Sequence, residues 1–414
     1  MSTEKLSPLD QLMAEWGKRV GHIITSEEHR AKGPGFTNST LNRDATQDGI
    51  RIFVDGGGDL NPLFRDPEYG KKTQYKCLLA PTNYLYTICW AQRPQDHGPM
   101  IPGTSGFYSG CEREWFRPIC EGDKFTYRVM VPSDNIMKTS KFAGRVVQSY
   151  EKCDYYRQGG ELVAGYSSYE TFAEEEQIKG KNKYGNLDKM PKYSEKDLAE
   201  IYAAQDREEI RGANPRYWED VNIGEELTPV VRGPLGDTEV RAWHAGSHAH
   251  YLSDRLNRIL WAKEPLEKVF NTNAMGSAYP RPAVTGQQPE AWRFILLTNW
   301  MGDDGFLWKF NTQIRGFTML GDTTWVKGKV IKKYCDNGKY CVDIDIRNVL
   351  QTEAMTIIGS AAVILPSREH GSVVYPQPYP RVPWAEIAKW YRPRTTFVVI
   401  ELRFLSVGGE GRRT

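Results

Sequence analysis

The sequence has almost no net charge and no long apolar run, and these absences exclude several classes of protein. Lys and Arg total 54 against 52 Asp and Glu, a formal charge of +2, which argues against nucleic-acid binding because phosphates require a basic surface. No stretch of about 18 apolar residues occurs, so we expect no membrane-spanning helix and no membrane partner. The N-terminus has no apolar run behind a basic start, so we expect a cytoplasmic protein without a secretion signal.

Cysteine and histidine are also scarce, which limits the chemistry that the chain can perform. The seven cysteines are odd in number and form no C-x-x-C pair, which argues against a disulfide framework and a zinc site. Three of the seven histidines, His244, His248 and His250, lie close together, but a metal ion would need a further ligand and only Asp254 is near. We therefore expect neither a bound metal nor a cofactor.

The residues that are present predict a folded chain of two or three domains. Aromatic residues make up 12% of the 414 residues, far more than a disordered chain contains. Apolar spacing predicts helices over residues 6–20, 82–90 and 289–300. The second of these helices is expected to be buried, and Pro81 is allowed in its first turn. Strands are predicted where Val, Tyr, Thr and Ile alternate between turn residues, over 124–131, 143–150, 161–172, 310–314, 323–333, 340–347 and 354–365.

The order of a helix followed by several strands occurs twice, which suggests a duplicated unit. Arg117 precedes Gly122-Asp123 in the first half and Arg315 precedes Gly321-Asp322 in the second, each pair leading into a strand. The other interpretation is that Gly-Asp is merely a common turn dipeptide. If the unit is duplicated, we expect an N-terminal domain over residues 1–175 and a C-terminal domain over residues 216–372. Residues 176–215 are then a charged linker with a surface helix, and residues 373–414 are a tail.

The most informative passage is Gly58-Asp59-Leu60-Asn61-Pro62-Leu63-Phe64, followed by Ala80-Pro81-Thr82 at the start of the buried helix. It resembles the MaoC-like dehydratase family of the hot-dog fold. Further matching segments are residues 114–123, 141–147, 231–235, 242–246 and 297–304, which resemble the fused members of that family. The resemblance implies an α+β double hot-dog fold, in which two antiparallel sheets each wrap a helix, and a homodimer as the assembly.

The resemblance also implies an activity and a set of site residues. The activity is that of an enoyl-thioester hydratase or 3-hydroxyacyl-thioester dehydratase, acting on an acyl-CoA or acyl-carrier substrate. Such a reaction needs groups that move protons and donors for the thioester oxygen. Asp59 matches the family's acidic residue. His244, in a Trp-His-Ala-Gly motif that resembles the family, is the best candidate for the catalytic histidine. These two are the expected catalytic residues. The expected substrate-binding residues are Asn61, Ala80, Thr82, Asn83 and Tyr108.

The chain departs from the family pattern at the residue that should be histidine. Phe64 stands there and can carry no proton, and residues 267–274 of the second half contain no histidine either. Tyr108 also stands where relatives often show histidine. Two alternatives therefore stay open. One is a protein that binds acyl or polyketide-like ligands without hydratase activity, and the other is a thioesterase or cyclase on the same fold.

Overall fold

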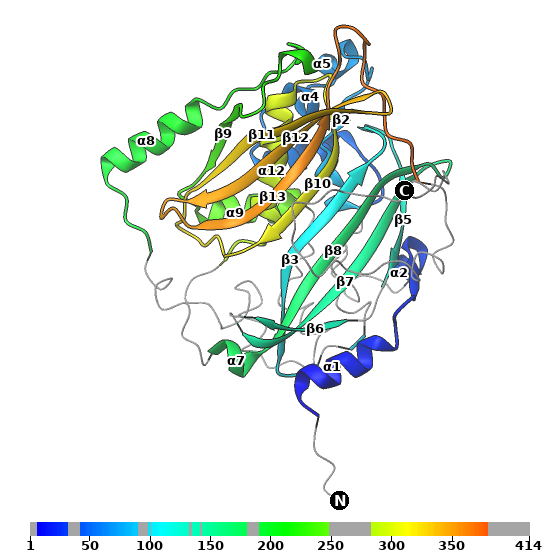
Figure 1. Cartoon of the computed structure of the whole chain (residues 1–414), viewed down its shortest axis with the longest axis vertical. Helices are drawn as coiled ribbons and strands as arrows, with labels where there is room; N and C mark the ends of the chain where they lie inside the picture. The colour runs from blue at the N-terminus through cyan, green and yellow to red at the C-terminus, as the bar shows by residue number, and fades with distance from the viewer. Residues whose placement is uncertain are drawn as a thin grey trace, which may run out of the picture.

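An antiparallel sheet of eleven strands forms the frame of the molecule (Figure 1). The computed structural model describes residues 6–31, 42–89, 98–99, 101–131, 135–140, 143–179, 190–247 and 283–379. Across the sheet the strands run in the order β1-β5-β7-β8-β3-β10-β13-β12-β11-β9, and β6 pairs with β7 beside this path. Within the described ranges, no helix has both the length and the apolar character that a membrane span requires. The α+β class predicted from the sequence is confirmed.

Strands from the N-terminal half occupy one side of this sheet. They are β1 (Ile23–Thr25), β3 (Thr104–Trp115), β5 (Phe125–Met130), β6 (Ile136–Ser140), β7 (Gly144–Arg157) and β8 (Leu162–Glu174). In β5 the buried residues Phe125, Tyr127 and Val129 alternate with exposed ones, as expected for a strand with one face on the core. The sequence predicts β5, β7 and β8 but not β3, whose glycines and charged residues are poor strand formers.

Strands from the C-terminal half complete the sheet and curve around a central helix (Figure 1). They are β9 (Glu226–Arg232), β10 (Phe306–Ile314), β11 (Thr324–Asp336), β12 (Lys339–Leu350) and β13 (Met355–Ile364). The helix is α12 (Gln287–Met301), and all fifteen of its residues are buried. A helix that is enclosed on every side needs apolar residues all round, which is why Trp292, Phe294 and Leu297 face different directions.

The segment of the N-terminal half that was expected to form a matching helix is a short 3-10 helix. This is η1 (Thr82–Thr87), which is buried as predicted but is not α-helical. Its sequence, Thr-Asn-Tyr-Leu-Tyr-Thr, is poor in good α-helix formers, which accounts for the difference. Residues 90–97, which would continue this segment, lie outside the described part of the chain.

Several contacts join the two halves, and three of them show how the halves are arranged. β3 pairs with β10 from Glu114 opposite Lys309 to Gly110 opposite Gln313, so the sheet is continuous across the junction. Helix α3 (Gln47–Gly57) packs on α9 (Asp237–Gly246), where a Cβ atom built on Gly56 would lie 2.5 Å from the Ala242 carbonyl oxygen. The Tyr69 hydroxyl donates to Asp303 over 2.6 Å, just beyond α12. These contacts hold the halves together as one core.

Shorter elements complete the described structure. Helix α8 (Glu195–Asp206) lies in the charged stretch between the halves, capped by Ser194, and projects from the sheet (Figure 1). Tail residues up to Tyr379 cross onto the N-terminal half, where the Tyr379 hydroxyl donates to Asp154 over 2.6 Å. The remaining elements are α1 (Pro8–Gly17), α2 (Ser26–Ala31), α4 (Pro62–Arg65), α5 (Pro67–Lys72), β2 (Leu79–Ala80), β4 (Ile119–Cys120), α7 (Glu175–Lys179) and η2 (Trp218–Asp220).

Candidate active site

The end of helix α3 fixes the position of Asp59. Thr46 caps the start of the helix, and Gly58 closes its end in the left-handed conformation with a φ of 68°. This cap turns the chain sharply, and the Asp59 amide donates back to the Val54 carbonyl over 2.9 Å. Glycine is favoured at this position because it has no Cβ to clash in the left-handed region. The Gly58-Asp59 pair therefore places the carboxyl directly at the helix end.

The Asp59 carboxyl is enclosed by protein and titrates near neutral pH. Its side chain is only 5% exposed, and its Oδ1 accepts a hydrogen bond from the Asn61 amide over 2.9 Å. Burial raises the pKa of Asp59 to about 6, although the Asn61 amide and the positive charge of Arg232 act in the opposite direction. A carboxyl with such a pKa exists in both protonation states at ordinary pH, which suits proton transfer.

Asn61 and Phe64 both stabilise the segment that follows Asp59. The Asn61 side chain is buried and its Oδ1 accepts from the Leu63 amide over 3.0 Å, which caps helix α4. Phe64 lies in the hydrophobic core with its ring almost fully buried. The position where the family pattern has histidine is therefore filled by a packed aromatic ring.

An ion-pair network from the C-terminal half lies beside Asp59. Arg232, at the end of β9, donates to the Gly58 carbonyl over 2.9 Å and forms an ion pair with Glu208 at 2.7 Å. The Asn299 amide on α12 donates to the same Glu208 over 3.0 Å. Arg232 and Glu208 both influence the pKa of Asp59, in opposite directions. None of these three residues was among the site residues expected from the sequence, because no spacing pattern relates them to Asp59.

Three of the expected substrate-binding residues, Ala80, Thr82 and Asn83, lie in a turn that is held by a small second sheet. β2 and β4 pair Leu79 with Cys120 and Ala80 with Ile119. Cys77 and Cys120 form a disulfide next to this pairing, although the number and spacing of the cysteines argued against a disulfide framework. Two cysteines 43 residues apart meet only through the fold, and no motif indicates them. Ala80 therefore leaves a braced strand pair and leads directly into η1.

Beyond Ala80 the turn is buried, and it contains an unused polar group. Asn83 and the Thr82 side-chain oxygen are enclosed, and Thr82 Oγ1 has no hydrogen-bond partner among the described residues. The Thr82 carbonyl accepts from the Trp115 indole over 3.0 Å, which fixes the turn against β3. The turn is thus held against β3 and contains one buried hydroxyl without a partner among the described residues.

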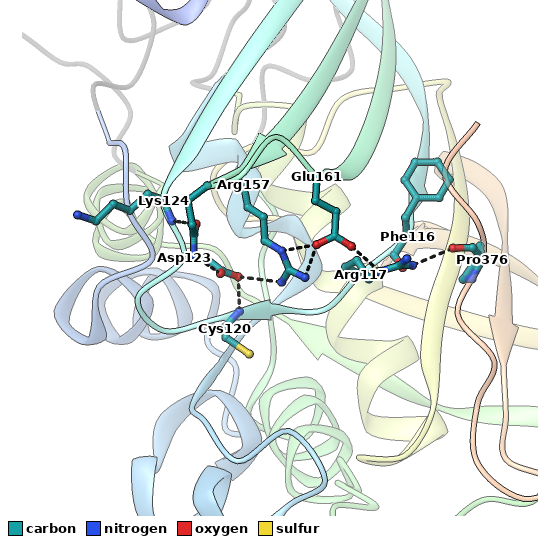
Figure 2. A network of polar contacts seen from close by, with 9 residues as sticks. Phe116, Arg117, Cys120, Asp123, Lys124, Arg157, Glu161 and Pro376 are labelled. Atoms are coloured by element: carbon teal, nitrogen blue, oxygen red, sulfur yellow. Dashed lines mark hydrogen bonds and ion pairs between the residues drawn. The ribbon is translucent and has the colours of Figure 1, made fainter. Parts of the chain in front are cut away.

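A network of alternating acidic and basic side chains lies next to β4 of this strand pair (Figure 2). Asp123 accepts from the Cys120 amide over 2.9 Å and lies 3.8 Å from Arg157. Glu161 bridges Arg157 and Arg117, accepting from each over 2.7 Å. Arg117 also donates to the Pro376 carbonyl over 3.0 Å, so the tail joins the network. These residues lie in and around the segment 114–123 that carries part of the family resemblance, and they position β4.

His244 lies on α9, the helix that packs on α3. Its side chain is half-buried, and burial lowers the pKa of His244 to about 4, so the ring is neutral at pH 7. The charged neighbours that shift the pKa of Asp59 are Arg232, Glu208 and Arg65, and His244 is not among them. The role expected for His244 stays a prediction. His248, His250, Asp254 and residues 267–274 lie outside the described residues.

Tyr108 lies in a buried polar cluster at the start of α12. Its hydroxyl donates to Glu290 over 2.6 Å, and Tyr86 of η1 donates to the other oxygen of the same carboxyl. Arg113 lies 3.5 Å from that second oxygen, with its guanidinium between the rings of Tyr86 and Tyr166. These polar contacts involve none of the partners of Asp59. The sequence analysis missed Glu290 because it lies within an apolar helix.

Comparisons with known proteins agree with this architecture. Residues 33–165 match the family model for the FAS1-like dehydratase domain region, which covers the Asp59 segment. A UPF0336 protein from Streptomyces avermitilis is 29% identical over 93 residues, which are 20% of this chain and 58% of that protein. The matched segment thus spans little more than half of that relative.

Two solved structures share the fold over most of the chain. A MaoC-like dehydratase aligns with 84% of this chain and 99% of its own, with a TM-score of 0.58 and 14% identity. A conserved hypothetical protein of Mycobacterium tuberculosis with a double hot-dog fold aligns with 85% of this chain and 98% of its own, with a TM-score of 0.50 and 9% identity. The resemblance predicted from the sequence is confirmed: the chain has a double hot-dog fold and is similar to a MaoC-like dehydratase.

Proposed function

We propose that this protein is an enoyl-thioester hydratase or 3-hydroxyacyl-thioester dehydratase in which Asp59 transfers the proton. The observation that carries the proposal is the buried carboxyl of Asp59, whose pKa burial raises to about 6. At pH 7 such a carboxyl is mostly ionised and can take a proton from the attacking water. In the reverse direction its protonated form returns that proton to the leaving hydroxyl. The substrate is an acyl-CoA or acyl-carrier thioester.

The turn of residues 80–83 completes the proposed site. As water adds to the double bond, negative charge develops on the thioester oxygen and must be stabilised by hydrogen-bond donors. Thr82 Oγ1 is a buried hydroxyl without a partner, in the turn held by the β2 and β4 pairing. Asn83 is buried in the same turn. We assign these residues to the thioester oxygen, and Asn61 to the positioning of Asp59.

His244 is proposed to assist as a base. Because burial lowers its pKa to about 4, the ring is neutral at physiological pH and can accept a proton but has none to spare. A neutral His244 would therefore accept a hydrogen bond from the attacking water, while Asp59 takes the proton of that water and passes it to the α carbon, so that the hydration balances. The expected homodimer and the expected cytoplasmic location are part of the same proposal.

The test is turnover of 2-enoyl-CoA thioesters by the purified chain. The variant Asp59→Asn keeps the size and most hydrogen bonds of the side chain but cannot accept a proton. We expect it to lower kcat for hydration by about 100-fold or more, the usual contribution of a general base. The matched control is Asp48→Asn, a strongly exposed carboxylate on α3, which should leave turnover unchanged. Equal turnover by wild type and Asp59→Asn would remove Asp59 from the mechanism.

Phe64 supports a second candidate, a protein that binds acyl thioesters without hydrating them. This residue is packed in the core at the position where the family pattern has histidine. The second candidate predicts heat of binding for an enoyl-CoA in calorimetry and no change in the conjugated thioester absorbance. Any enzyme-dependent hydration that the Asp59→Asn substitution abolishes would contradict it.

A further inference from the structure

Residues 373–379, here called the strap, lie along the N-terminal half and end in a tyrosine whose side chain is bound on several sides. The Tyr379 hydroxyl donates to the buried Asp154 over 2.6 Å, and the Lys152 ammonium lies 4.6 Å from the centre of the ring. The ring of Phe116 meets the Tyr379 ring edge-on at 5.5 Å. A carboxyl, a cation and an aromatic ring therefore hold the end of the strap.

The sheet leaves space for this tyrosine at one residue. Gly165 lies in β8, paired with Asp154 of β7, and a Cβ atom built on it would lie 2.8 Å from the Tyr379 hydroxyl oxygen. Glycine inside a strand often marks the close approach of another group. A larger residue at position 165 would displace Tyr379 and not the sheet, because the hydroxyl is the far end of a side chain.

Earlier in the strap, two residues contact the segments that lead into β2 and β4. The Tyr375 side chain forms a hydrogen bond with Tyr75, shortly before β2 begins, and its ring meets the Phe306 ring at 5.0 Å. The Pro376 carbonyl accepts from Arg117 over 3.0 Å, shortly before β4 begins. The strap thus touches the chain at both entrances to the β2–β4 pair.

The charged network carries the contact at Arg117 onward to β4 (Figure 2). Glu161 accepts from Arg117 and from Arg157, each over 2.7 Å. Asp123 lies 3.8 Å from Arg157 and accepts from the Cys120 amide over 2.9 Å. A continuous series of polar contacts therefore connects the strap to β4.

Their own pairing holds β2 and β4 only weakly in place. Each strand has two residues, and the pair consists of Leu79 with Cys120 and Ala80 with Ile119. Two-stranded ribbons are marginally stable even when they are longer. The disulfide of Cys77 joins the two strands to each other but not to the large sheet. The position of the turn at residues 80–83 therefore depends on the groups around the pair, including the strap.

We propose that the strap is a positioning element of the candidate site: the turn of residues 80–83 reaches its working position only while the tail is docked on the N-terminal half. Tyr375 and Tyr379 act through β2 and β4, so they are positioning residues and not catalytic ones. The effect on turnover rests on the proposed hydratase activity, whereas the link from the strap to the turn does not. Undocking of the tail is then sufficient to lower activity, with Asp59 unchanged.

The test displaces the strap in the full-length protein with Gly165→Ala. The added methyl group takes the space of the Tyr379 hydroxyl, and alanine is no worse a strand former than glycine. Tyr379→Phe removes that hydroxyl, so in the double variant Gly165→Ala/Tyr379→Phe the clash is gone and the ring can dock again. Rescue in the double variant shows that the effect of Gly165→Ala passes through the strap.

Hydrogen–deuterium exchange measured by mass spectrometry follows the amides of β2 and β4. We expect exchange of residues 78–82 and 119–121 to become about three- to tenfold faster in Gly165→Ala, the value of one lost hydrogen bond. Tyr379→Phe keeps its ring docked and should show a smaller increase, to which the double variant should return. Exchange of β12 should not change, because this strand belongs to the C-terminal half of the sheet.

Gly328→Ala is the matched control. Gly328 lies in β11, and its added Cβ would lie 2.9 Å from a methyl carbon of Leu227, so this variant also displaces the end of a side chain, but in the C-terminal half. It should leave the exchange of β2 and β4 unchanged. If Gly165→Ala does not fold, Tyr379→Phe decides with the same peptides.

Turnover of a 2-enoyl-CoA is the second readout. Gly165→Ala should lower kcat by about three- to tenfold with KM almost unchanged, because a displaced turn affects the developing oxyanion more than the bound substrate. The double variant should recover the kcat of Tyr379→Phe. A variant that merely lost stability would instead exchange faster in all peptides, β12 included.

Three results would overturn the proposal. The first is unchanged exchange of residues 78–82 and 119–121 in Gly165→Ala. The second is faster exchange that the double variant does not rescue or that Gly328→Ala reproduces. The third is an unchanged kcat in an active protein whose exchange responds as expected. If the wild type hydrates no thioester, the proposed function fails, and the exchange data alone then decide whether the strap positions the turn.

Discussion

Asp59 is a buried ionisable residue and His244 a half-buried one, and burial moves their pKa values in opposite directions. Burial disfavours the charged form of each group, so it raises the pKa of the Asp59 carboxyl to about 6 and lowers the pKa of His244 to about 4. At pH 7 the carboxyl is therefore mostly ionised and the imidazole is neutral. Both can accept a proton under these conditions, which is the capacity that hydration requires of a base.

These shifts predict opposite effects of pH on stability at the two residues. The pKa of His244 is lower in the folded state than in the unfolded state, so this residue costs stability as the pH falls from about 6.5 toward 4. The pKa of Asp59 is raised, so this residue costs stability as the pH rises from about 4 toward 6. His244→Gln should therefore gain stability relative to wild type at the acid end of this range, and Asp59→Asn at its neutral end.

Urea unfolding of wild type and both variants between pH 4 and 7 measures these pH-dependent changes in stability directly. The difference in unfolding free energy between each variant and wild type should change with pH, with opposite slopes for the two variants. Parallel stability curves for wild type and a variant would show that burial does not shift the pKa of that residue.

At this scale the sequence predicts some residues of the candidate site and not others. The Gly-Asp-x-Asn-Pro word identifies Asp59 and Asn61, because the turn chemistry and the carboxyl are contiguous in the chain. Arg232 and Glu208 could not be predicted, since they are far from Asp59 in the sequence and come near it only through the fold, where Arg232 donates to the Gly58 carbonyl. The disulfide partner of Cys77 is invisible for the same reason.

At the scale of elements, the packing of α3 on α9 determines where Asp59 lies. The two helices approach so closely at Gly56 and Gly246 that a Cβ built on Gly56 would lie 2.5 Å from the Ala242 carbonyl oxygen. No real Cβ atom tolerates that distance to a backbone oxygen, so the helices would have to separate. The close approach therefore requires glycine at position 56.

The neighbouring residue provides a matched comparison. Gly56→Ala should destabilise the protein by about 1–3 kcal/mol, the usual cost of overpacking. Gly57→Ala in the same helix meets no atom within 4 Å and should be neutral or stabilising by up to about 1 kcal/mol, because alanine is the better helix former. Thermal unfolding of the two variants tests this. Equal stability of both variants would show that α3 and α9 do not pack this closely.

Helices and strands were predicted correctly where the intrinsic conformational preference of the residues agrees with their tertiary packing. The strands β11, β12 and β13 are rich in β-branched residues and were found from the sequence. β3 was missed because its partners β8 and β10 impose the strand on residues that do not favour it. The helix predicted over residues 82–90 is a 3-10 helix because its β-branched and aromatic residues favour an α-helix only weakly.

At the scale of the whole molecule, the resemblance to the fused MaoC-like proteins predicted the double hot-dog fold correctly, and the duplicated order of elements agrees with it. The repeat could not show how the halves are joined, because the pairing of β3 with β10 is a long-range contact. It also could not show that the two ends of α12 have different environments. Asn299 joins the Asp59 network at one end, and Glu290 joins the buried cluster around Tyr108 at the other.

The pH dependence of hydration tests the role of Asp59 most directly. We expect kcat/KM of the wild-type protein for a 2-enoyl-CoA to rise about tenfold per pH unit below pH 6 and to level off above it, as the free enzyme's carboxyl ionises. Asp59→Asn should remove this dependence together with most of the activity. Hydration whose kcat/KM stays constant through pH 6, or that survives the substitution, would contradict the assignment of Asp59 as the proton-transfer group.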